Sequence, residues 1–125
     1  MPLQPGLSAR ASLTVTEGDT AESLGSGDVP VLGTPRIVAL GEQACVSAVT
    51  PKLQPGETTV GRRVQLDHLV PIPVGGSVTA EATLDRVEGR RLTFTVTVSD
   101  SRGLVAAGKV TRVVVDRERF LERAT

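Results

Sequence analysis

One stretch of the chain decides the fold: residues 33–51 read GTPRIVALGEQACVSAVTP. Thr34 is a favoured helix N-cap, and Pro35 suits the first helical position because its missing N–H would be unpaired there anyway. Pro51 ends the helix near Thr50. One face of the predicted helix is apolar and carries small residues that let a sheet approach its axis closely. That face consists of Ile37, Leu40, Gly41, Ala44, Cys45 and Ala48.

Strands are predicted on both sides of this helix, because apolar and polar residues alternate there. They cover residues 10–16, 58–69, 77–87, 92–99 and 104–115. Short turns at 88–90 and 100–103 join the last three strands as antiparallel hairpins. Residues 17–28 read as a loop, and a short helix is predicted around 116–123.

One strand, then the helix, then four strands predict a fold of the α+β class. One long helix wrapped by a curved antiparallel sheet of about five strands is the layout of the hotdog fold, although other α+β folds share this element order. We expect residues 1–9 to form a flexible leader and residues 10–125 to form a single domain.

The composition excludes several classes of protein. The chain has 125 residues, and its 14 basic and 14 acidic side chains cancel, which argues against nucleic acid as a partner. No apolar run could span a membrane, and the N-terminus lacks the apolar core of a secretory signal, so we expect a cytoplasmic protein. One cysteine and one histidine make neither an internal disulfide nor a metal framework, and no cofactor is expected. A small core without Trp or Tyr favours assembly with a second subunit.

Two polar residues are predicted in apolar surroundings. Glu42 lies in the helix interior between Val46 and Val49 on the helical wheel, so it either extends to water or serves a site. His68, the only histidine, shares the phase of Val60, Val64 and Leu66 in the strand 58–69, and it is therefore expected to face the core. It is either a structural histidine or a general acid–base group suited to neutral pH.

Thr34 and Arg112 each have two interpretations, and Cys45 has one. Thr34 is explained as an N-cap, but a hydroxyl at the start of a helix can also meet an anionic or carbonyl group. Arg112 lies in the apolar run 110–115, so it needs either an anion or an exposed strand end. Cys45, without a second cysteine, reads as a small buried hydrophobic residue.

Several short motifs resemble the fluoroacetyl-CoA thioesterase family of hotdog proteins, from about residue 31 to residue 122. They are TP at 34–35, LGEQACV at 40–46, LQPGE at 53–57, VG at 60–61, His68, and VEGRRL at 87–92. The spacing adds to the resemblance. Eight residues separate Thr34 from Glu42 and 26 separate Glu42 from His68, as in the Thr–Glu–His set of the family.

The resemblance implies an acyl-CoA thioesterase in which Thr34, Glu42 and His68 are catalytic. It also implies that Gly61 contacts the substrate carbonyl and that Arg112 contacts the substrate or its CoA portion. Family members are homodimers whose sheets join edge to edge, with active sites at the subunit boundary, so a homodimer or a dimer of dimers is expected.

The resemblance further implies the chemistry and one departure from it. Glu42 would attack the thioester carbonyl or activate a water, His68 would transfer protons, Thr34 would orient Glu42 or the carbonyl, and an N–H near Gly61 would stabilise the oxyanion. Fluoroacetate-specific members carry phenylalanines in the loop before the helix. Residues 21–31 contain none here, so a different short- or medium-chain acyl group is expected.

Two alternatives stay open at the level of the sequence. One is a hotdog enoyl-CoA hydratase, which would use an acid–base pair without needing Thr34. The other is a non-catalytic module that binds acyl-CoA or an acyl carrier.

Overall fold

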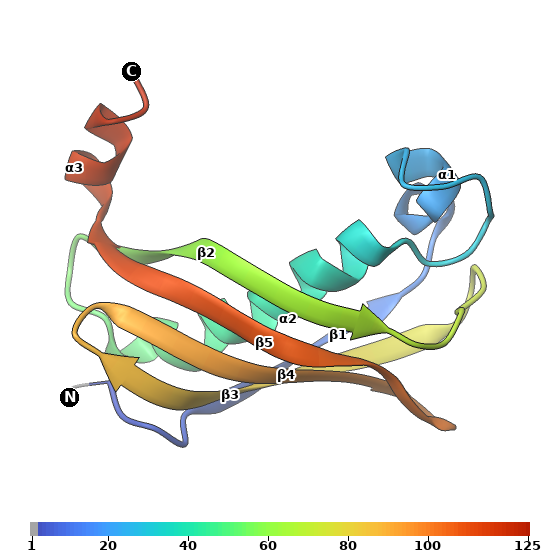
Figure 1. The fold of residues 1–125 in the computed structure, drawn as a ribbon, viewed down its shortest axis with the longest axis horizontal. Coiled ribbons are helices and arrows are strands. Elements are labelled where there is room, and N and C mark those ends of the chain that lie inside the picture. Colours follow the sequence, from blue (N-terminus) through green and yellow to red (C-terminus); the bar gives the residue numbers. More distant parts are fainter. Residues whose placement is uncertain (1–2) are drawn as a thin grey trace.

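A curved antiparallel sheet wraps around one long helix (Figure 1), and the computed structural model describes residues 3–125 of the chain. The strand order in the sheet is β1-β3-β4-β5-β2, so β1 and β2 are the two edges. The strands are β1 (Ser8–Thr14), β2 (Glu57–His68), β3 (Ser77–Glu88), β4 (Arg91–Asp100) and β5 (Gly103–Asp116). The helices are α1 (Ala21–Leu24), α2 (Thr34–Val49) and α3 (Arg117–Glu122). The predicted α+β class and element order are confirmed.

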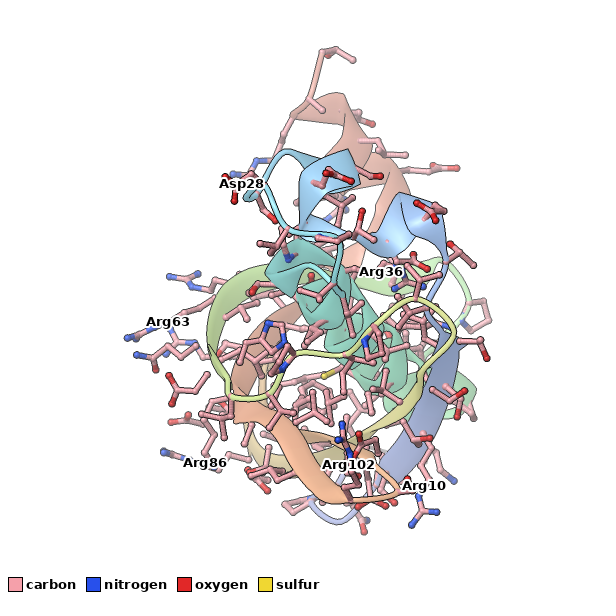
Figure 2. The ribbon with its side chains drawn as sticks, turned by 90° about the vertical axis from the view of Figure 1, so that its right-hand side faces the viewer. Arg10, Asp28, Arg36, Arg63, Arg86 and Arg102 are labelled. Carbon is pink, nitrogen blue, oxygen red and sulfur yellow. The ribbon has the colours of Figure 1, made fainter. Side chains whose placement is uncertain are left out.

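Helix α2 lies in the hollow of the sheet, as the end-on view in Figure 2 shows. Its buried residues are Ile37, Leu40, Gly41, Ala44, Cys45, Ala48 and Val49, which confirms the predicted apolar face and adds Val49. The prediction of Thr34 as the N-cap is wrong. Gly33 occupies that position and Thr34 is the first helical residue, without a capping hydrogen bond. The Thr34 hydroxyl is therefore free for another partner.

The core is built almost entirely from aliphatic side chains that α2 and the inner face of the sheet share. Phe94 on β4 is the one fully buried aromatic ring, and it pairs across the strands with Leu84 and Val110. Alternate residues of β3 and β4 are buried, while the threonines between them face outward. This alternation is that of an antiparallel sheet with one covered face.

A bulge in β2 changes which residues face the helix. Gly61 pairs with Arg112 and Arg63 pairs with Thr111, so Arg62 has no partner in β5. A one-residue bulge shifts the side-chain alternation by one. The expectation that Val60 shares the face of Val64 and Leu66 is therefore wrong. Before the bulge the inward residues are Thr59 and Gly61, and after it they are Val64, Leu66 and His68.

The segment before α2 is more ordered than the predicted loop at 17–28. It holds a 3₁₀ turn at Glu17–Asp19 and the short helix α1. Asp19 connects it to α2, because its carboxylate accepts from Arg36 at 3.1 Å and its carbonyl accepts from the N–H of Gly33 at 2.9 Å. Hydrogen bonds from Thr16 hold the pKa of the Asp19 carboxyl below its usual value of 3.8. A lowered pKa means that this anchor is intact at neutral pH and is lost only in acid.

The two ends of the chain also differ from the expected boundaries. Gly6 donates to the carbonyl of Leu84 and Leu7 accepts from the Leu84 N–H, both at 2.8 Å, so the chain is held to β3 before residue 10. Met1 and Pro2 of the predicted leader lie outside the described residues. At the other end Asp116 caps the short helix α3, close to the predicted range. No helix within residues 3–125 combines the length and hydrophobicity needed to cross a membrane. The cytoplasmic location stays a prediction.

A substitution at Gly108 on β5 would test how closely β5 packs against β2. A Cβ atom at this position would overlap the backbone of Gln65 on the neighbouring β2. We expect Gly108→Ala to lower the free energy of unfolding by about 3 kcal/mol or more, because two strand backbones would have to separate. Gly18→Ala is the matched control, since a Cβ there meets no atom within 4 Å. Denaturant unfolding of both variants measures the difference, and equal stabilities would contradict the packing.

Candidate active site

Thr34 and His68 meet where the start of α2 faces the end of β2. The Thr34 hydroxyl lies 2.8 Å from His68 Nδ1. Thr34 is exposed and His68 is half-buried, facing the helix side of the sheet as predicted. A small cavity of about 160 Å³ adjoins the imidazole and is lined by Val31, His68, Leu69, Val70 and Pro71.

The second nitrogen of His68 determines which way this hydrogen bond runs. His68 Nε2 lies 3.1 Å from the carbonyl oxygen of Val70, which can only accept a hydrogen bond. In neutral His68 the proton therefore sits on Nε2, and Nδ1 accepts from the Thr34 hydroxyl. A hydroxyl that donates to an imidazole held by a third group is the arrangement of a nucleophile or polarised hydroxyl beside its base.

Glu42 and Arg112 form a second cluster, near the middle of α2 and the first half of β2. Arg112 Nη1 donates to Glu42 Oε2 at 2.6 Å. The rest of the guanidinium is held by Thr59, whose hydroxyl accepts from Nε at 3.0 Å and whose carbonyl accepts from Nη2 at 2.9 Å. The side chain of Arg112 is only 8% exposed, whereas that of Glu42 is 29% exposed. Arg112 is thus neither an edge charge nor a surface residue, and it positions the carboxylate of Glu42.

Gly61 lies directly under this carboxylate. A Cβ on Gly61 would overlap Glu42 Oε2 and would lie 3.4 Å from Arg112 Nη1. No side chain can occupy this position without displacing the Glu42 carboxylate. Only Oε2 has a hydrogen-bond partner within residues 3–125, so Oε1 is left available for another group.

The structure therefore brings the five predicted residues together as two clusters rather than one. Thr34 lies with His68, and Glu42 lies with Gly61 and Arg112. Eight helical residues separate Thr34 from Glu42, a Cα distance of about 12 Å. Gly61 and His68 are about 20 Å apart along the strand, allowing for the bulge. No hydrogen bond connects the two clusters in the described part of one chain.

Sequence reasoning missed Thr59 and the Val70 carbonyl. The predicted phase of the strand 58–69 implies that Thr59, next to Val60, faces outward, because alternation alone gives no sign of the bulge. The Val70 carbonyl is a backbone group, which no residue pattern distinguishes. Cys45 is fully buried as predicted, and burial raises the pKa of its thiol to about 12. Within residues 3–125 no three His, Cys, Asp or Glu side chains gather as metal ligands would.

Solved structures with the same fold define the class of protein. A variant of the fluoroacetyl-CoA thioesterase FlK in complex with acetyl-CoA has a TM-score of 0.92 at 30% identity, over 98% of this chain and 96% of FlK. A hot-dog-like protein from Thermanaerovibrio acidaminovorans has a TM-score of 0.88 at 30% identity, over 98% of this chain and 90% of that one. The fold is thus the hotdog fold, which confirms the prediction.

Sequence comparison identifies the family within this class. The family described as fluoroacetyl-CoA-specific thioesterase matches residues 15–118. A fluoroacetyl-CoA thioesterase from Streptantibioticus cattleyicolor is 39% identical over 90 residues, which make up 72% of this chain and 65% of that protein. The chain belongs to this family, and the predicted resemblance is confirmed. The match spans just under two thirds of the length of that relative.

Gly61 provides a test of the Glu42 cluster. Gly61→Ala would displace the carboxylate from Arg112, and we expect thioesterase activity to fall about 10²-fold, because a misplaced catalytic group loses its alignment. The fold should persist, since the added methyl meets a side chain rather than a backbone. Hydrolysis of a CoA thioester and a thermal melt measure the two effects. Unchanged activity would show that the carboxylate need not lie over Gly61.

Proposed function

We propose that the protein hydrolyses a short- or medium-chain acyl-CoA thioester to the free acid and CoA, with Thr34, Glu42 and His68 as catalytic residues. The observation that carries this proposal is the hydrogen-bonded Thr34–His68 pair, whose tautomer the Val70 carbonyl fixes. Glu42 supplies the second reactive group through Oε1, which has no hydrogen-bond partner within residues 3–125, and family membership supports the reaction. A FlK variant solved with acetyl-CoA supports CoA thioesters as the substrate class.

The two clusters of one chain can form a single site if two copies share it. Strand β2 is an edge, hydrogen-bonded only to β5 among the described strands. A free edge of twelve residues is a template for pairing with another strand. In a two-fold dimer the paired edges would be antiparallel, so the Glu42 half of one chain would face the His68 half of the other. This supports the homodimer and the boundary location that the family resemblance implies.

One register of such a pair brings the two clusters together and keeps inner residues opposite inner residues. With Gln65 on the two-fold axis and Arg62 left out, Gly61 lies opposite His68 of a second copy. Residues opposite each other in an antiparallel pair point to the same face. In this register Val64 lies opposite Leu66 on the inner face, and Arg63 lies opposite Asp67 on the outer face, where their charges are complementary. Shifting the pair by one residue would put inner residues opposite outer ones.

In this arrangement the reaction divides between the two chains. Glu42 of one copy would attack the thioester carbonyl, forming an acyl anhydride that water then hydrolyses to the free acid, or it would activate a water that attacks the carbonyl directly. Arg112 would hold its other oxygen. His68 of the second copy, hydrogen-bonded to Thr34, would transfer protons and finally protonate the leaving thiolate. A backbone N–H near Gly61, which carries no side chain of its own, would stabilise the oxyanion.

The surroundings of Thr34 support an aliphatic acyl group. The curated relative is a fluoroacetyl-CoA thioesterase, but residues 21–31 contain no aromatic side chain here. Exposed aliphatic residues lie near the Thr34 end instead, with Leu24 42% exposed, Val29 49% and Leu69 59%. Leu24 packs beside Gly33, next to Thr34. Acyl chains of graded length would show which substrate this surface selects.

Single substitutions test the assigned roles. We expect Glu42→Gln and His68→Ala each to lower kcat about 10²-fold or more, because each removes a group that acts on the reacting atoms. Thr34→Ala should also lose activity, whereas Thr34→Ser keeps the hydroxyl that His68 binds. Glu81→Gln on the outer face removes a carboxylate away from the site, so this control variant should keep full activity. Release of CoA from acyl-CoA thioesters is the measurement, and full activity of Glu42→Gln and His68→Ala would refute the site.

Mixing two inactive variants tests whether the site is shared. Co-expressed Glu42→Gln and His68→Ala chains would form mixed dimers in which one site has neither substitution. Half of randomly formed dimers are mixed, so activity should recover to about a quarter of the wild-type level. If both residues acted within one chain, each site would carry one substitution and no activity would return.

The alternatives from the sequence are less well supported. A module that only binds acyl-CoA would need neither a carboxylate held over Gly61 nor an oriented Thr34–His68 pair. A hydratase would not need Thr34, and the family match names thioesterases. Hydration of an enoyl-CoA in place of thioester cleavage would favour the hydratase.

A further inference from the structure

The cavity between α3 and the end of β5 is basic and contains an aromatic ring. It has a volume of about 320 Å³ and lies at the end of the sheet where α3 projects past β5 (Figure 1). Its lining consists of Arg90, Val113, Val114, Val115, Asp116, Arg119, Phe120 and Arg123. No residue of this cavity belongs to the two clusters described above.

The arginines of this cavity are largely free to bind an anion. Arg119 and Arg123 are exposed and form no ion pair within residues 3–125. Arg90 is 64% exposed, and its Nη1 makes two long contacts of 3.4 Å, with Glu57 Oε2 and with the Val114 carbonyl. Asp116 is the acidic residue of the lining, and one of its oxygens already accepts from the N–H of Arg119 at 3.1 Å. The cavity therefore has a surplus of positive charge in a chain whose overall charge is zero.

Phe120 is the second feature of the cavity. The chain has two aromatic side chains other than histidine, and the other, Phe94, is fully buried. Phe120 is half-buried, and it also lines a neighbouring cavity of about 200 Å³ with Thr58, Thr59 and Val60. Thr59 holds Arg112, which holds Glu42. A series of adjoining cavities and contacts thus leads from the ring to the carboxylate of the proposed site.

Another basic cavity of comparable size is less suited to an anion. It lies on the outer face of the sheet and is lined by Arg63, Arg86 and Lys109, among others. Lys109 is paired with Asp85 at 3.2 Å and Arg86 with Glu88 at 3.1 Å, and this cavity has no aromatic ring. Figure 2 shows Arg63 and Arg86 pointing away from the sheet rather than toward each other.

We propose that the cavity at α3 binds the nucleotide end of CoA, with Arg90, Arg119 and Arg123 on its phosphates and Phe120 against the adenine ring. This inference rests on the proposed function, since it assumes a CoA thioester as substrate. Arginine guanidinium groups match phosphate geometry, and an aromatic face suits a purine. Phe120 and Arg123 lie beyond residue 118, where the family match ends, so this subsite involves residues outside that match.

Calorimetric titration with CoA and with dephospho-CoA, which lacks the ribose phosphate, tests the proposal without turnover. The unsubstituted protein should bind CoA about tenfold more tightly than dephospho-CoA, as expected for hydrogen bonds to a charged group. The double variant Arg119→Gln/Arg123→Gln should lose this difference and bind both equally. Phe120→Leu, which keeps an apolar side chain, should weaken both ligands by the same factor. Arg102→Gln, at the opposite end of the sheet, is the control and should match the unsubstituted protein.

Two outcomes would overturn the proposal. One is unchanged discrimination between CoA and dephospho-CoA in the double arginine variant. The other is a change in molar mass of the variants by light scattering, which would mean that α3 packs against a second copy instead. Hydrolysis of an acyl-pantetheine thioester, which lacks the nucleotide, separates this question from the function. The α3 variants should hydrolyse this substrate at the normal rate. If neither the variants nor the unsubstituted protein hydrolysed it, that result would count against the proposed thioesterase function and not against the CoA subsite.

Discussion

The ion pair between Glu42 and Arg112 is the interaction on which the position of the Glu42 carboxylate depends. It joins the middle of α2 to β5 through the interior, and Thr59 of β2 completes it. The Arg112 side chain is buried, so loss of the Glu42 carboxylate would leave its charge without that partner. Small residues on α2 allow this contact, because Gly41 lies close to Val96 and a Cβ there would be 3.1 Å from it. The same pair holds the Glu42 carboxylate against Gly61.

The helix and the strands could be predicted from the sequence because their signals are local. Pro35 and Pro51 bracket α2, and the alternation in β3 and β4 continues without interruption to the bulge near Asp85. The phase of β2 could not be predicted, because a bulge depends on the neighbouring strand. Thr34 was likewise assigned to a local role as a cap, when its partner is His68, 34 residues away. Pairing of distant polar groups is a tertiary property that periodicity does not reveal.

The candidate residues themselves came from spacing shared with a family, and the structure supplies what spacing cannot. It separates them into two clusters and gives each a neighbour that sequence reasoning had missed: the Val70 carbonyl for His68 and Thr59 for Arg112. Thr34 is exposed, and β2 has no partner on its outer edge among the described strands, so both candidate clusters lie open to water in the described part of one chain. A reaction that benefits from exclusion of water would need that opening to be covered.

The extra residue in β2 means that the strand can lose one residue at that point without changing its faces. Odd-numbered residues face α2 before Arg62 and even-numbered residues face it afterwards. If Arg62 were removed, Gly61 would still lie opposite Arg112 and Arg63 opposite Thr111, so the ladder would become regular and both halves would keep their inner residues. Such a deletion would remove the local bend and twist that a bulge gives to the strand beside the Glu42 carboxylate.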